Sequence, residues 1–239
     1  MRVRASVKSV VRHLDGLSPV RSFLLVVAVL AVVYVPTATW SSDLNVDVDA
    51  AVGPAWRLGT HGDVYVENLH WNPWYITVGQ HQVSNRPPGV VFWAAPWYAL
   101  FQDLSHPTVW QSTAAALAAT LLAMGFLHLG LRRITTPLLA ISATLVMGLG
   151  TATWPVSSDQ RWSHGPAQLW VALGLLALSY DMSFTSGLAF GLGLLTRPPV
   201  AFLAAGTGIA WGWLRRSWRR FLLLGVGTLL GLVGLIAYN

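Results

Sequence analysis

The sequence predicts an all-α integral membrane protein with about seven transmembrane helices. Of its 239 residues, 54% are hydrophobic and only 10% are charged, whereas soluble domains carry roughly 25% charged residues. Apolar stretches of membrane length recur from Ser22 to the C-terminus, and the 13 Trp are a residue type favoured at membrane–water interfaces. A protein of this composition lacks the charge to cover a water-facing surface.

The predicted crossings are separated by short polar turns. They start near Phe23, Thr108, Pro137, Ala167, Phe184, Val200 and Phe221. A signal peptide is the rival interpretation of the first, but the basic segment before it is long and further crossings follow, which favours a retained anchor. The apolar segment 89–101 is short and contains Pro96. We expect it to be re-entrant or interfacial, because broken backbone at membrane depth is tolerated when it is buried in protein.

The basic residues predict the orientation. A cytoplasmic N-terminus over residues 1–21 places eleven of the 15 Lys and Arg inside, five in that segment, two at Arg132-Arg133 and four in 215–220. The transmembrane domain, 22–239, then has a first external loop at 40–88 and a second external turn at 155–166. We therefore expect a multi-pass protein of the cell membrane that contacts membrane lipids. The net charge of +6 is explained by topology and predicts no nucleic-acid partner.

The first external loop is acidic where it leaves the membrane. Asp43, Asp47 and Asp49 follow the first crossing, and a carboxylate at the membrane surface can accept a proton from a hydroxyl group. The alternative is that these acids only populate an external loop. Residues 47–59 predict a short helix that Gly62-Asp63 ends, and the rest of this segment is expected to be loop.

Two arginines precede Pro-Pro pairs on different external segments. Arg86 and Arg197 each present a planar fork suited to phosphate, on backbone that proline stiffens. They could hold a lipid phosphate or simply extend to the interface.

The second external turn carries Asp159, Arg161 and His164. Such a set can bind metal or act in acid–base chemistry, but a plain polar turn explains it as well. The chain has no cysteine and no zinc-type histidine spacing, so no metal site is predicted.

The order of these features resembles the GT-C superfamily of integral-membrane glycosyltransferases, in particular its protein mannosyltransferase and aminoarabinose transferase branch. The family's Ala-x-x-Leu-x-x-x-Gly pattern matches Ala55, Leu58 and Gly62, and its spacing places the catalytic Asp on Asp47. The position after it, Glu in many members, is Val48, with Asp49 next, so the choice between the two aspartates stays open.

Further segments carry the same resemblance. Residues 85–88, Asn-Arg-Pro-Pro, look like the family's Lys/His-Pro-Pro-Leu segment, and residues 195–198, Leu-Thr-Arg-Pro, look like its Leu-Thr-Lys/Arg-Gly/Pro segment. Residues 154–166 are similar to the external turn in which Asp159 or His164 would face the site.

The resemblance implies transfer of a sugar from a polyprenyl-phosphate donor to a glycan, lipid or protein acceptor, with inversion and without a cofactor or metal. Asp47 would act as general base, and Arg86 or Arg197 would bind the leaving phosphate. Members of the family are often longer, so the chain is expected to be a fragment or a shortened relative. A small-solute transporter is the main alternative, although the predicted crossings contain few of the ionisable residues that transport pathways need. A non-catalytic membrane remnant is another.

Overall fold

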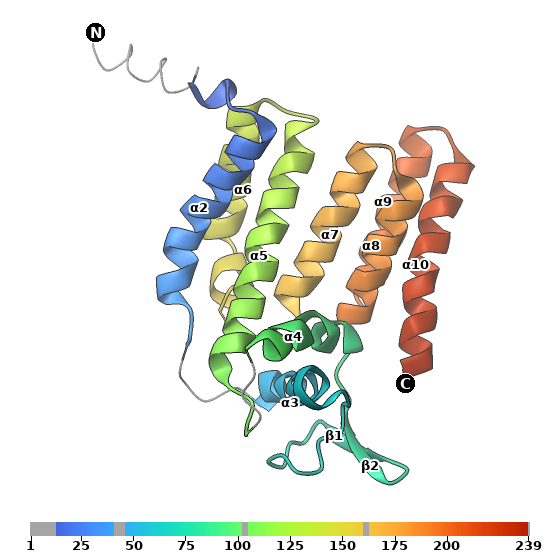
Figure 1. The fold of residues 1–239 in the computed structure, drawn as a ribbon. Coiled ribbons are helices and arrows are strands. Elements are labelled where there is room, and N and C mark those ends of the chain that lie inside the picture. The colour runs from blue at the N-terminus through green and yellow to red at the C-terminus, as the bar shows by residue number, and fades with distance from the viewer. Residues whose placement is uncertain (1–12, 41–45, 102–104, 160–162, 239) are drawn as a thin grey trace.

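The computed structural model describes residues 13–40, 46–101, 105–159 and 163–238. Asp43, Arg161 and most of the basic N-terminus, which the sequence singled out, lie outside these ranges. The fold is predominantly helical, and its long helices stand side by side and roughly parallel (Figure 1). They are α2 (Pro19–Thr37), α5 (Val109–Arg132), α6 (Pro137–Gly150), α7 (His164–Ser179), α8 (Ser183–Thr196), α9 (Val200–Leu214) and α10 (Trp218–Tyr238).

Three of these helices, α2, α5 and α10, are long and apolar enough to cross a membrane. The helices α6, α7, α8 and α9 have only 14, 16, 14 and 15 residues. At 1.5 Å per residue they span roughly 21–24 Å, less than the ~30 Å hydrocarbon core. Seven crossings therefore stay a prediction, although each expected crossing coincides with a helix.

The helix boundaries follow from local sequence signals. Helix α2 begins with Pro19, whose fixed φ suits a first turn, and the Ser18 hydroxyl accepts a hydrogen bond from the Arg21 amide at 3.3 Å. Thr136 caps α6 in the same way. In the interior, the Tyr34 hydroxyl donates to the Gly148 carbonyl at 2.7 Å, which fixes α2 against α6.

Glycines allow α8 and α10 to pack at very short distance. A Cβ added at Gly231 would lie 2.5 Å from the Cα of Gly191 and closer still to its carbonyl group, and one at Gly187 would lie 3.0 Å from the Cα of Gly227. Both helices thus carry a Gly-x-x-x-Gly pair, the pattern that brings membrane helices into backbone contact. Because α10 packs directly against α8, this contact fixes the end of α8 that carries Arg197.

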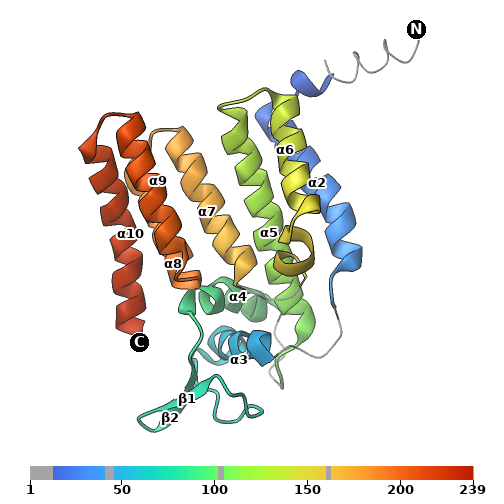
Figure 2. The same ribbon diagram turned by 180° about the vertical axis from the view of Figure 1, so that it is seen from behind.

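Short elements close one end of the helix array. Helices α3 (Val46–His61) and α4 (Pro88–Leu100) lie across it, with strands β1 (Tyr75–Val78) and β2 (His81–Ser84) beyond them (Figures 1 and 2). The π-helical turn η1 (Thr153–Ser157) lies at the same end. We call this the site end. The opposite end, where the α5–α6, α7–α8 and α9–α10 turns lie, carries seven of the described arginines and is called the basic end: Arg21, Arg132, Arg133, Arg215, Arg216, Arg219 and Arg220.

The hairpin corrects one sequence expectation. Residues 75–84 were expected to be loop in an all-α protein, but β1 and β2 pair antiparallel, with Val78 opposite His81. The turn between them uses Gly79 at a φ of 63°, a conformation that glycine adopts at no steric cost. The run of β-branched residues Ile76, Thr77 and Val78 before this Gly was the available signal.

Candidate functional site

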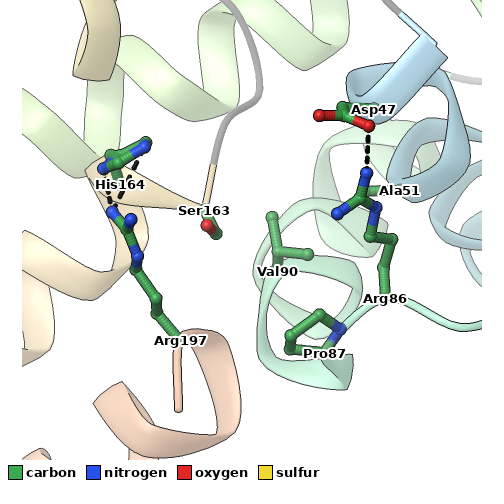
Figure 3. A pocket seen from close by; sticks show the side chains of 8 residues that line it. All are labelled: Asp47, Ala51, Arg86, Pro87, Val90, Ser163, His164 and Arg197. Atoms are coloured by element: carbon green, nitrogen blue, oxygen red, sulfur yellow. Dashed lines mark hydrogen bonds and ion pairs between the residues drawn. The ribbon is translucent and has the colours of Figure 1, made fainter. Parts of the chain in front are cut away.

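A cavity of about 270 Å³ opens at the site end, where α3, α4, α7 and α8 meet. Five of its residues carry polar side chains, and they come from four segments that lie far apart in the sequence (Figure 3). The lining consists of Asp47, Ala51, Arg86, Pro87, Val90, Ser163, His164 and Arg197. Three other residues that the sequence analysis proposed for the site, Arg86, His164 and Arg197, therefore line the same cavity as Asp47.

Asp47 and Arg86 form an ion pair on one side of the cavity. Asp47 lies in the first turn of α3, where the helix dipole favours a carboxylate, and an Arg86 Nη2 donates to its Oδ1. The guanidinium carbon of Arg86 lies 4.0 Å from the centre of the Trp74 ring. The Asp47 side chain keeps 39% of its surface exposed, so the carboxylate is accessible to a substrate.

Arg197 and His164 form the facing side (Figure 3). Arg197 ends α8 because Pro198 and Pro199 follow it. Its Nη1 lies against the His164 ring, 3.2 Å from Nε2 and closer to Nδ1. His164 precedes the crossing predicted from Ala167. Burial, and then the neighbouring Arg197 charge, lower the pKa of His164, so it is neutral at pH 7 and offers a nitrogen lone pair to Arg197.

Gly89 allows the two sides of the cavity to approach each other closely. A Cβ at Gly89 would lie 2.6 Å from the Thr196 amide nitrogen and 2.8 Å from the Leu195 carbonyl carbon. Only a residue without a side chain allows the start of α4 to approach the end of α8 this closely. The Arg86-Pro-Pro-Gly segment and the segment ending in Arg197 are thus direct neighbours, which the sequence alone did not indicate.

Asp49 faces away from this cavity. Its Oδ2 accepts a hydrogen bond from the Asn72 side chain at 3.1 Å, and the same Asn72 nitrogen donates to the Val46 carbonyl. Burial, and then the charge of Asp49, raise the pKa of the nearby Tyr75 phenol. Asp49 therefore fastens α3 to the segment before the hairpin, and of the two candidate aspartates only Asp47 lines the cavity.

Asp159 is also outside the cavity. Its Oδ1 accepts a hydrogen bond from the Thr39 amide at 2.6 Å, so it joins the second external turn to the segment that follows α2. The expected supporting role of Asp159 at the site stays a prediction. Ser163, which the sequence did not single out, does line the cavity.

The cavity suits a ligand that carries a phosphate and a hydroxyl group. Two guanidinium groups provide planar, charged donors for phosphate oxygens, and the Nε of Arg86 is buried without a hydrogen-bond partner among the described residues. An exposed carboxylate supplies a proton acceptor. Within the part of the chain that the structure describes, no three His, Asp or Glu side chains are grouped so that they could hold a metal.

No protein-family model matches the chain, and no curated protein or solved structure is significantly similar to it.

Proposed function

We propose that this chain is a membrane glycosyltransferase of the GT-C type, which moves a sugar from a polyprenyl-phosphate donor to an acceptor hydroxyl. One observation carries the proposal: Asp47 shares a cavity at the site end with Arg86 and Arg197. A base beside two phosphate-binding cations is what displacement of a lipid phosphate from a sugar requires. Asp43–Asp49, the two Arg-Pro-Pro segments and the turn at 154–166 support it by their order in the sequence.

In the proposed reaction Asp47 removes the proton from the acceptor hydroxyl. The hydroxyl oxygen attacks the anomeric carbon, the bond from that carbon to the phosphate oxygen breaks, and the configuration inverts. The electron pair of the broken bond leaves with the polyprenyl phosphate. Arg86 and Arg197 stabilise the negative charge that develops there, and His164 positions Arg197 through its ring nitrogens.

The ion pair between Asp47 and Arg86 gives the donor a further role. The Asp47 oxygen that accepts the hydrogen bond from Arg86 is occupied and cannot at the same time accept the proton of an acceptor hydroxyl. We propose that the donor phosphate takes over Arg86 when it binds. Asp47 then presents this oxygen to the acceptor, so that the base becomes effective only when a donor is present.

The proposal includes seven crossings with the N-terminus and the basic end in the cytoplasm. The arginines at the basic end support this orientation by the positive-inside rule, and α4 would lie at the outer face as the re-entrant or interfacial segment. Helices of 14–16 residues would cross where the bilayer thins or where flanking residues extend to the interface.

Single cysteines test this orientation without background, because the chain has none. Thr77→Cys in β1 is expected to react with a membrane-impermeant maleimide in intact cells. Ile134→Cys, in the α5–α6 turn and 76% exposed, is expected to react only after permeabilisation. Labelling of Ile134→Cys in intact cells would contradict the proposed topology.

Transfer itself is tested with the purified full chain in vesicles that contain a synthetic polyprenyl-phosphate mannose or arabinofuranose together with a hydroxyl-bearing glycan, lipid or peptide acceptor. Release of polyprenyl phosphate, followed by mass spectrometry, is the expected result. Arg197→Gln should weaken donor binding at least about tenfold, since hydrogen bonds to charged groups are worth about 1.5–3 kcal/mol. Arg57→Gln is the matched control, because Arg57 pairs with Asp63 and does not line the cavity.

Two results would count against this assignment. Donor binding without any release of polyprenyl phosphate, across sugars and acceptors, would indicate a lipid-binding protein and not a transferase. Equal effects of Arg197→Gln and Arg57→Gln on donor affinity would mean that the cavity does not hold the phosphate.

A further inference from the structure

A second, larger cavity lies at the basic end of the molecule. It has a volume of about 640 Å³ and opens between α5, α7 and α9. The cavity described above is at the opposite end of these helices (Figure 1), so the two are separate sites. The proposed reaction makes no use of this second cavity.

Two arginines line the second cavity. Arg133 follows α5 and Arg215 follows α9, and each guanidinium lies 4.5 Å from the centre of an aromatic ring, Tyr180 and Trp211 respectively. Stacking on a ring holds a cation in place and leaves its N–H groups available at the edge. Among the described residues neither Arg133 nor Arg215 has a carboxylate partner, whereas the nearby Arg220 pairs with Asp181.

The remaining wall is mostly apolar. Leucines from α5 and α7 supply much of it, namely Leu127, Leu131, Leu175, Leu176 and Leu178. Trp211 contributes its ring, and its Nε1 is buried without a hydrogen-bond partner in the described part of the chain. The cavity thus combines an apolar surface with two cations at one end of the helices.

We propose that this cavity binds an anionic phospholipid. The headgroup phosphate lies between Arg133 and Arg215, and the acyl chains cover the leucines. Basic pockets between membrane helices favour such headgroups. A free anion would leave the leucine wall uncovered, and a zwitterionic lipid brings its own cation to the two arginines.

The test is a titration of the full chain in detergent micelles, followed by native mass spectrometry. Phosphatidylglycerol and phosphatidylcholine with identical acyl chains are the probes. A basic residue near a membrane surface contributes about fivefold to anionic-lipid binding, so two give about 25-fold. The protein is expected to prefer phosphatidylglycerol by about that factor, and Arg133→Gln with Arg215→Gln should abolish the preference.

A control double variant removes two positive charges from the same basic end of the molecule. Arg216→Gln with Arg219→Gln alters two arginines that do not line this cavity, and it should keep the preference. If both double variants lose the preference for phosphatidylglycerol equally, general surface charge causes the preference and the proposed site is wrong. Displacement of phosphatidylglycerol by millimolar inorganic phosphate would also overturn it, since that result describes a free-anion site.

A second variant keeps both arginines. Ala210→Trp places an indole in the cavity from α9, whose Ala210 lines it, and is expected to prevent phosphatidylglycerol binding. This variant decides the question if the double arginine variant does not elute as a monodisperse species. Unchanged binding in Ala210→Trp would place the lipid elsewhere and refute the proposal.

Discussion

Replacement of Asp47 by Asn is expected to reduce sugar transfer by about 10²–10⁴-fold, the usual contribution of a general base. An amide cannot accept the proton of the acceptor hydroxyl at neutral pH. It retains an oxygen that can accept the hydrogen bond from Arg86, so the cavity keeps its shape. The rate of polyprenyl phosphate release in vesicles measures the loss, and membrane extraction and the thermal melting curve verify that insertion and folding are unchanged.

Asp49→Asn is the matched control for this variant. It makes the same chemical change two residues further along α3, but Asp49 accepts its hydrogen bond from Asn72 and does not line the cavity. We expect transfer to stay within a few-fold of the wild-type rate, with a lower melting temperature because a charge-assisted hydrogen bond is weakened. Wild-type turnover in Asp47→Asn, or an equal loss in both variants, would remove Asp47 from its proposed role.

The contrast between the two aspartates shows what the sequence could predict at the site. Residues two apart in a helix point about 200° from each other, so Asp47 and Asp49 were bound to face different surroundings. Which of them faces the cavity depends on where α4 and Asn72 pack against α3. That information lies in contacts between segments 23 and 39 residues apart, and no local pattern encodes it.

Positions of helices were predictable for a different reason. Apolar runs bounded by proline, arginine or glycine determine where a helix begins and ends, and the crossing predicted from Val200 begins at the first residue of α9. Asp159 could not be assigned in this way. Its partner is the Thr39 amide, 120 residues away, so its linking role became visible only in the folded chain.

The sequence analysis did not predict the hairpin of β1 and β2 or the contact between α8 and α10, although both have local signals in the sequence. Gly187-x-x-x-Gly191 and Gly227-x-x-x-Gly231 are spaced for close helix packing. A glycine-rich helix, however, gives no indication of which neighbour it approaches. In the structure the two pairs face each other, and this contact connects the last helix to the helix that ends at Arg197.

Gly231→Leu is therefore expected to have the largest effect on stability. The new side chain would collide with the backbone of Gly191, since even a Cβ lies 2.5 Å from its Cα, and backbone cannot move aside as a flexible side chain can. Overpacking typically costs about 1–3 kcal/mol, and we expect the upper end of that range. Thermal unfolding in detergent, followed by circular dichroism, measures the loss.

Gly225→Leu makes the identical substitution in the same helix on another face. A Cβ at Gly225 meets no atom within 4 Å, so the change in unfolding free energy should stay within about 0.5 kcal/mol. Equal destabilisation by both variants would attribute the effect to leucine in α10 in general. A loss confined to Gly231→Leu would locate it in the contact with α8. Because the Tyr238 hydroxyl of α10 also lies 3.5 Å from the Ser84 carbonyl of β2, separation of α10 from α8 should loosen both sides of the Asp47 cavity and reduce transfer as well.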